Sequence, residues 1–261
     1  MVNAIWGASL RQKKTSLYYV EKAISKGAEL KTEYEAVRIK KIGKDFKVEG
    51  EEKGKPVAFS AKNVILSAGA INTPKILNNS GLRTPKKFFA DLFVTIGGTV
   101  NHSFRDEIQM ASYISFEDFL VSPYYSERIV KILNAKNIEA KRENIICLMI
   151  KIKDDPYGNV GKNYIEKSCT GKDVQKISNG VAIASGILNK CGVEKIVSTE
   201  MSGAHPGGTA PIGISVDNKF KTEMGFYVCD ASVLPESPGA PPMITLMALG
   251  KKLGQNILNS T

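Results

Sequence analysis

The chain has 261 residues, of which 43% are hydrophobic and 24% are charged, as in an ordinary globular protein. No run approaches the roughly 20 apolar residues that cross a membrane, and the first residues lack the apolar core of a signal peptide, so we expect a cytoplasmic protein. The formal net charge is +10, but the lysines are scattered singly or in pairs, which favours a solvated basic surface over nucleic-acid binding.

The cysteines do not indicate a zinc site. They form no Cys-x-x-Cys pair, and only two histidines could join them. Cys147 and Cys229 lie in apolar runs that predict buried thiols. The absence of a disulfide spacing pattern fits a reducing compartment.

The first elements in chain order are a helix and a group of strands. Residues 15–27 are predicted to form a helix, with Thr15 as its cap and Gly27 at its end. The following residues alternate as strands do, with turn residues between them. They predict a small antiparallel meander over 28–32, 36–42, 45–49 and 56–60.

A strand, a loop of small residues and a helix come next. The unbroken apolar run 64–67 is typical of a strand that is buried on both faces. A helix is then predicted with Thr73 as its cap and Pro74 in its first position, ending at Gly81. This order is half of a mononucleotide-binding α/β unit.

Residues 88 to about 204 predict a separate α+β region. Residues 92–100 and 145–152 have the character of strands, and residues 173–189 that of a helix. From residue 226 the chain returns to a buried strand, a loop and a helix. The apolar face of this last helix is predicted to consist of Met243, Ile244, Met247 and Leu253.

Several segments resemble one known enzyme family. The stretch from Gly69 to Leu82 resembles the second signature of the glucose–methanol–choline (GMC) flavin oxidoreductases. The family's C-terminal block is matched in order by His205-x-x-Gly-Thr209, Asp230-Ala-Ser232 and Pro242-x-x-Thr245. The resemblance implies an incomplete FAD/NAD(P)-binding Rossmann-like domain (α/β) with an inserted antiparallel-sheet substrate domain (α+β). The first would be formed by 1–87 and 226–261, and the second by 88–225.

The resemblance also implies FAD as the cofactor and a CH–OH donor, such as an alcohol or sugar, as the substrate. His205 would be the base, because a neutral imidazole accepts protons near neutral pH. A helix beginning at Pro242 would direct its positive end toward the flavin. The residues implied in FAD binding are Val37, Ser67, Ala68, Gly69, Asp230, Ala231, Pro242 and Thr245.

For some of these residues a purely structural role stays open. Val37 is equally interpreted as a core residue of a strand, and Asp230 as the cap of a turn. The aromatic residues of the inserted region would line a substrate pocket or form ordinary core. His102 has no motif around it and is interpreted as a structural or surface histidine.

Two features depart from the family pattern. The sequence has no Gly-x-Gly-x-x-Gly loop, which grips the ADP half of FAD in the family, so we expect a second chain to supply it. Pro241 stands where the family usually has a second catalytic His or Asn. Proline offers no side-chain donor or acceptor, so that group is missing unless Ser237 or another residue substitutes.

These departures leave two interpretations of function. The chain is one part of a split enzyme, or it is a catalytically inactive GMC-like remnant or interaction subunit. In either case a missing central strand would leave apolar faces and an open sheet edge. We therefore expect the isolated chain to aggregate, to form oligomers or to need a partner.

Overall fold

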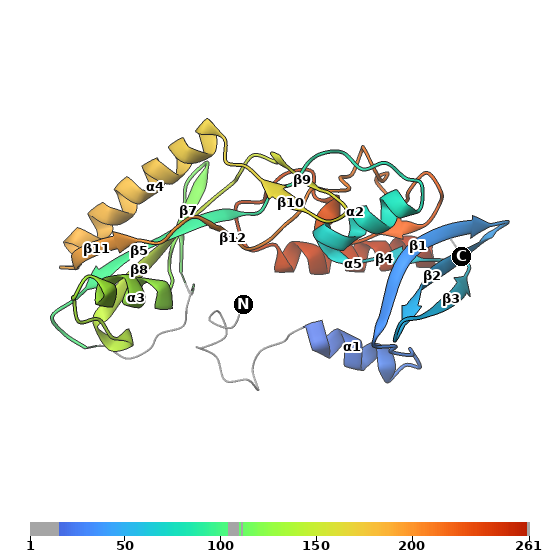
Figure 1. The fold of residues 1–261 in the computed structure, drawn as a ribbon, viewed down its shortest axis with the longest axis horizontal. Coiled ribbons are helices and arrows are strands. Elements are labelled where there is room, and N and C mark those ends of the chain that lie inside the picture. Colours follow the sequence, from blue (N-terminus) through green and yellow to red (C-terminus); the bar gives the residue numbers. More distant parts are fainter. Residues whose placement is uncertain (1–15, 104–109, 111, 260–261) are drawn as a thin grey trace.

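The computed structural model describes residues 16–103, 110 and 112–259. They form two lobes along one long axis (Figure 1). One lobe is built on a six-stranded sheet, and the other carries a parallel strand pair and a three-stranded meander. This confirms the predicted combination of an incomplete Rossmann-like part with an antiparallel-sheet part. Among the described residues no helix is both long and apolar enough to span a bilayer.

The N-terminal helix and the meander form largely as predicted. Helix α1 spans Ser16–Ile24, and the chain leaves it through Gly27 at a φ of +93°. The predicted cap, Thr15, lies outside the described residues. Residues 28–33 form no strand, which corrects the prediction for 28–32. The antiparallel meander consists of β1 (Tyr34–Ile42), β2 (Asp45–Glu52) and β3 (Lys55–Ala61).

A short parallel pair forms the centre of this lobe. Strand β4 (Ile65–Leu66) pairs with β13 (Tyr227–Val228), although 162 residues separate Ile65 from Tyr227. Helix α2 (Gly69–Asn79) follows β4, while a 3-10 turn (Ala231–Val233) and helix α5 (Met243–Leu258) follow β13. Leu66 is buried, but Ile65 is 49% exposed, so the strand is not covered on both faces.

Helix α2 begins earlier than the sequence predicts. Ala68 is its N-cap and Pro74 is its sixth residue, not its first. Because Pro74 has no N–H, the carbonyl of Ala70 loses its helical partner, and the Thr209 hydroxyl donates to it at 2.9 Å instead. The predicted cap, Thr73, lies inside the helix, fully buried. The start moves because a distant carboxylate, Asp230, accepts from the Gly69 N–H at 2.9 Å.

The other lobe contains a sheet with the order β11-β5-β8-β7-β6, and β12 also pairs with β5. All its neighbouring strands are antiparallel. Helix α4 covers one face, where Ala184 and Leu188 pack in one core with Ile96 and Ile150. The elements of this lobe are β5 (Leu92–Thr99), β6 (Ile114–Ser115), β7 (Phe119–Pro123), α3 (Glu127–Ala135), a 3-10 turn (Arg142–Asn144), β8 (Ile145–Ile152), α4 (Gly171–Lys190), β11 (Glu194–Ser198) and β12 (Ser202–Gly203).

A small hairpin connects β8 to α4. It consists of β9 (Gly158–Val160) and β10 (Ile165–Lys167), which pair in antiparallel register. After β12 the chain returns to the lobe that carries the meander. There Ala210, Val216 and Phe220 belong to the core that contains β4, α2 and β13.

The predicted apolar face of α5 is wrong for two of its four residues, Met243 and Ile244. Leu253 is buried, but Met247 is only partly covered, and Met243 and Ile244 are 58% and 77% exposed. The helix instead packs through Leu249, Leu253 and Ile257, which are spaced four residues apart on one side. Its other side is left uncovered by the described residues.

A close contact fixes the Gly-Gly turn beside the sheet. The Phe89 ring is fully buried, and its backbone pairs with that of Gly207. A Cβ atom on Gly207 would lie 2.1 Å from the Phe89 ring. Gly208 has a φ of +79°, which favours glycine. Both glycines are therefore needed for the turn that follows His205.

We predict that Gly207→Ala lowers the free energy of unfolding by about 1–3 kcal/mol, because the Phe89 ring must move out of its packed position. Gly186→Ala is the matched control. Gly186 lies in α4 with open space around its Cβ position, so this change should stabilise by up to about 1 kcal/mol. Urea unfolding followed by circular dichroism measures both. Equal effects of the two substitutions would contradict the assigned contact.

The contact between Thr209 and α2 gives a second prediction. Thr209→Val should cost about 1–3 kcal/mol of unfolding free energy, because it leaves the buried Ala70 carbonyl without a donor. Pro74→Ala supplies a backbone N–H for the same carbonyl. In that background Thr209→Val should cost about 1 kcal/mol less. A double-mutant cycle of urea midpoints measures the difference, and additive effects would rule out the shared acceptor.

Candidate active site

His205 lies just after β12 and is tied to the start of β5. The backbone N–H groups of Ala204 and His205 both donate to the Ala90 carbonyl, at 2.9 and 3.1 Å. The His205 side chain remains 34% exposed. The residue is therefore anchored at its backbone, and its side chain is partly open to solvent.

A buried carboxylate holds one nitrogen of the ring. His205 Nδ1 lies 2.9 Å from Oδ2 of Asp91, whose side chain is fully buried. Nε2 forms no hydrogen bond with any residue of the described ranges, for which every His205 contact involves Nδ1 or the backbone. The arrangement resembles that of a histidine base oriented by an acid, with Nε2 free to take a proton.

A buried lysine completes an ion pair with the same carboxylate. Lys151, the last residue but one of β8, has a side chain that is only 1% exposed, and its Nζ lies 2.9 Å from Asp91 Oδ2. Nζ also lies 3.2 Å from the Asp91 carbonyl oxygen and 3.2 Å from His205 Nδ1. Burial lowers the pKa of Lys151, and the negative charge of Asp91 opposes that shift.

Ser237 joins the site through Asp91. It is fully buried, and its hydroxyl donates to Asp91 Oδ1 at 3.0 Å. The sequence suggested Ser237 as a substitute for the group missing at Pro241, and the structure places it behind the carboxylate and not against the imidazole. Pro241 itself is exposed.

A second buried carboxylate supports the first. The Asp154 side chain accepts from the backbone N–H groups of Ala90 and Asp91, at 3.0 and 2.8 Å. Lys167 neutralises it, with 3.0 Å between Nζ and Asp154 Oδ2. Asp91 has a φ of +58°, a conformation that aspartate tolerates better than most residues. The contacts on both sides hold it there.

Five of the residues implied in FAD binding meet at one edge of the β4–β13 pair. The Ser67 hydroxyl donates to the Cys229 carbonyl at 2.9 Å. Asp230 Oδ2 accepts from Gly69 N–H and from the Thr73 hydroxyl, at 2.9 and 2.6 Å. Asp230 Oδ1 accepts from Ser232 N–H at 2.7 Å. The structure thus brings together Ser67, Ala68, Gly69, Asp230 and Ala231, and Asp230 caps the turn as its structural interpretation predicted.

The other implied residues lie elsewhere. Pro242 is the N-cap of α5, and Thr245 is exposed in its first turn. Val37 sits at a bulge in β1, and its carbonyl accepts from the Asn79 side chain at the C-terminal end of α2. Gly69 begins that 11-residue helix, so roughly 16 Å of helix separates Val37 from the edge at Gly69. His102 is exposed.

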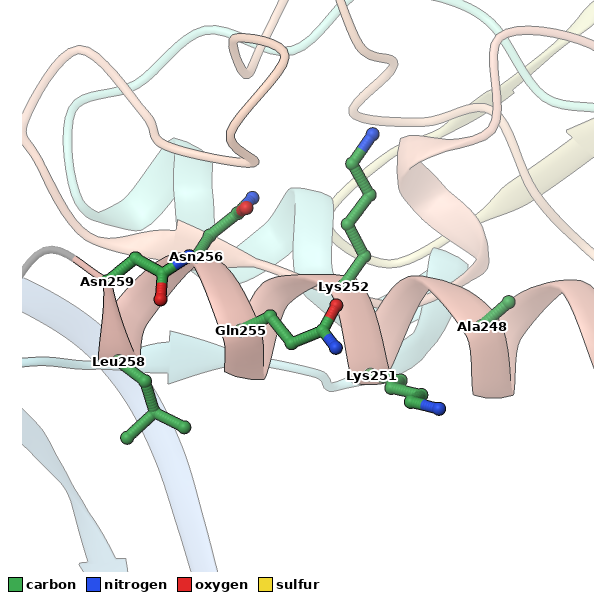
Figure 2. A pocket seen from close by; sticks show the side chains of 7 residues that line it. All are labelled: Ala248, Lys251, Lys252, Gln255, Asn256, Leu258 and Asn259. Carbon is green, nitrogen blue, oxygen red and sulfur yellow. The ribbon is translucent and has the colours of Figure 1, made fainter.

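One open hollow of about 640 Å³ lies on the outer side of α5 (Figure 2). Its lining contains none of the residues implied in catalysis or FAD binding. Lys251 and Lys252 project from the helix in different directions. The lining residues are Ala248, Lys251, Lys252, Gln255, Asn256, Leu258 and Asn259.

The sequence contained a signal for the ion pair. Lys151 is the only charged residue in the apolar run 145–152, and Asp91 is the only one in 88–100. A charge buried in an apolar run needs a partner of opposite sign. That rule could have paired Lys151, in the predicted strand 145–152, with Asp91, immediately before the predicted strand 92–100.

Comparison with known proteins identifies the family. A GMC oxidoreductase N-terminal model matches residues 7–106, and a GMC oxidoreductase C-terminal model matches residues 128–250. The chain belongs to the GMC oxidoreductase family.

Three similar proteins match most of this chain. An uncharacterised protein of Methanocaldococcus jannaschii, MJ1450, is 36% identical over 211 residues, which are 80% of this chain and 56% of that protein. An FAD-dependent oxidoreductase from Chaetomium thermophilum has a TM-score of 0.67 at 12% identity, covering 92% of this chain and 63% of its own. A fungal aryl-alcohol oxidase has a TM-score of 0.59 at 14% identity, covering 87% and 60%. The chain spans about 56–63% of the length of these relatives.

Proposed function

We propose that this chain forms the substrate side and the flavin-ring side of an FAD-dependent oxidoreductase that oxidises a CH–OH donor of the alcohol or sugar type. The observation that carries the proposal is His205, whose Nδ1 is bound to a buried carboxylate while its side chain remains 34% exposed. Membership of the GMC family supports it. The aryl-alcohol oxidase is named for a substrate of this chemical class.

The chemistry assigned to the chain is removal of a proton. Oxidation of an alcohol to a carbonyl requires loss of the hydroxyl proton together with a hydride from the same carbon. His205 Nε2 accepts the hydroxyl proton, and Asp91 stabilises the imidazolium that results. FAD, when bound, supplies the hydride acceptor.

The residues present fit the ring side of FAD. Helix α5 has no side-chain cap and no acidic residue in its first turn, so its first N–H groups and its positive end are available to an electron-rich ring edge. Asp230 gives the β4–β13 edge a negative charge that suits hydroxyl groups better than phosphates. We therefore assign Ser67–Gly69 and Asp230–Ala231 to the ribityl part.

The ADP part of FAD requires a further unit. Within the described residues β4 pairs on one side only, with β13. Apolar side chains are exposed on the same lobe, namely Leu17, Ile24, Ile65, Met243, Ile244 and Leu258. We propose that a second chain with a Gly-x-Gly-x-x-Gly loop adds its strand beside β4.

The four cysteines are all free, which suits the reducing cytoplasm.

Co-expression with such a chain tests the function. We expect a yellow complex whose flavin is bleached anaerobically by an alcohol or a sugar. His205→Gln should keep the flavin and slow the bleaching about 10²- to 10⁴-fold, because it removes only the base. His102→Gln, at the other histidine of the chain, is the control and should bleach at the wild-type rate. Stopped-flow absorbance measures the rates.

Two outcomes would contradict the proposal. A colourless complex would favour an inactive GMC-like interaction subunit, an alternative that the proline at position 241 supports. Bleaching that is unaffected by His205→Gln would leave the flavin role intact and remove His205 as the base.

A further inference from the structure

The network behind His205 determines which imidazole nitrogen carries the proton. Nδ1 faces two groups, the Asp91 carboxylate at 2.9 Å and the Lys151 ammonium at 3.2 Å. A neutral imidazole has one nitrogen that donates and one that accepts. If Nδ1 carries the hydrogen, Nε2 is the acceptor; if Nδ1 is bare, Nε2 is a donor and cannot serve as a base.

The carboxylate requires a hydrogen on Nδ1. Ionised Asp91 only accepts hydrogen bonds, so a bare Nδ1 at 2.9 Å would place two lone pairs against each other. Lys151 is adjacent to Nδ1, but it has other acceptors. Its Nζ lies 2.9 Å from Asp91 Oδ2 and 3.2 Å from the Asp91 carbonyl oxygen.

The donors around Asp91 leave the carboxylate no freedom to turn. Oδ1 accepts from Ser237, and Oδ2 is shared by Lys151 and His205. The backbone N–H of Asp91 is held by Asp154, itself paired with Lys167. Every polar group of Asp91 therefore has a named partner. The network fixes the direction of the imidazole as well as its tautomer.

We propose that Asp91 and Lys151 are positioning residues for His205. Asp91 holds the imidazole with its proton on Nδ1, which leaves the lone pair of Nε2 to accept a proton, and Lys151 pairs with Asp91 and holds it in place. The use of this lone pair in a reaction rests on the proposed function. The tautomer is a property of the chain alone.

Nitrogen NMR of the full chain, labelled with ¹⁵N-histidine, tests the assignment. The chain has only two histidines, and His102→Gln identifies the signals of His205. At a pH where the ring is neutral, we expect Nδ1 to have the shift of a protonated nitrogen and Nε2 that of a bare one. The opposite pattern in the wild-type protein overturns the proposal.

Substitutions then separate the two residues. In Asp91→Asn the side-chain amide can donate to Nδ1, so we expect the tautomer to invert. Asp217→Asn is the matched control, because Asp217 is exposed and bonds only to backbone N–H groups, and it should leave the shifts unchanged. If Asp91→Asn does not fold, the wild-type shifts still decide the question of the tautomer.

Lys151→Met tests the role of the lysine. The charged groups around the ring are Asp91 and Lys151, with Asp154 and Lys167 one contact further away. Lys151 lies 3.2 Å from Nδ1 and 2.9 Å from Asp91 Oδ2, so its removal should move the ¹⁵N shifts of both ring nitrogens of His205 relative to the wild-type chain. A lysine that merely filled space would leave these shifts unchanged, and such a result overturns its role.

These measurements are independent of turnover. A protonated Nδ1 in a chain that never forms an active flavin complex supports the positioning and contradicts the proposed function. An active complex with a bare Nδ1 contradicts the positioning alone. The two proposals therefore fail separately.

Discussion

The buried charge of Asp91 is the constraint on which the rest of the site depends. A carboxylate without solvent is costly unless it is paired and fully hydrogen-bonded, and removing one partner of such a pair typically costs about 3–5 kcal/mol. Lys151 neutralises Asp91, and Ser237 and His205 occupy its remaining positions. Because Lys151, Ser237 and His205 come from separate segments, these contacts with Asp91 form only when those segments have come together.

The pair also couples the two lobes. Asp91 lies immediately before β5, and Lys151 lies in β8, the neighbouring strand of the large sheet. Ser237 belongs to the segment that leads into α5. Gly239 approaches Lys153 closely, with its Cβ position 3.2 Å from the Cβ atom of that residue. The direction of the His205 ring and the start of α5 are therefore fixed relative to each other by the same contacts.

Carboxylates perform the same local task at the other edge. Asp230 accepts from the first N–H of α2 and from the turn after β13, just as Asp154 accepts from the chain before β5. At Gly69 and at Asp91 a side chain from a distant segment satisfies a backbone donor that no regular element satisfies, and Asp230 also satisfies the nearby Ser232 N–H. These contacts set the ends of the elements, and the site residues lie at those ends.

This explains which features the sequence could predict. The meander, the β4–α2 unit and the strands β5 and β8 follow from local periodicity, while the antiparallel sheet was implied by the family resemblance and His205 was found through its motif. The start of α2 was missed because Asp230, whose carboxylate accepts from the Gly69 N–H, lies 161 residues away. The network of His205 was missed because Asp91 and Lys151 lie 114 and 54 residues from it. The only local sign of such a long-range ion pair in the sequence is a single charged residue within an apolar run.

The proline at position 241 has a physical interpretation in this arrangement. In the family a second His or Asn usually stands there and contributes a polar side chain beside the catalytic base. Proline cannot contribute a donor, and here the polar groups stand behind the imidazole, as Asp91, Lys151 and Ser237. The charges of Asp91 and Lys151 act on Nδ1 from buried positions where solvent screens them little. With the tautomer proposed for His205, the front of the ring needs no second polar side chain to leave the Nε2 lone pair available.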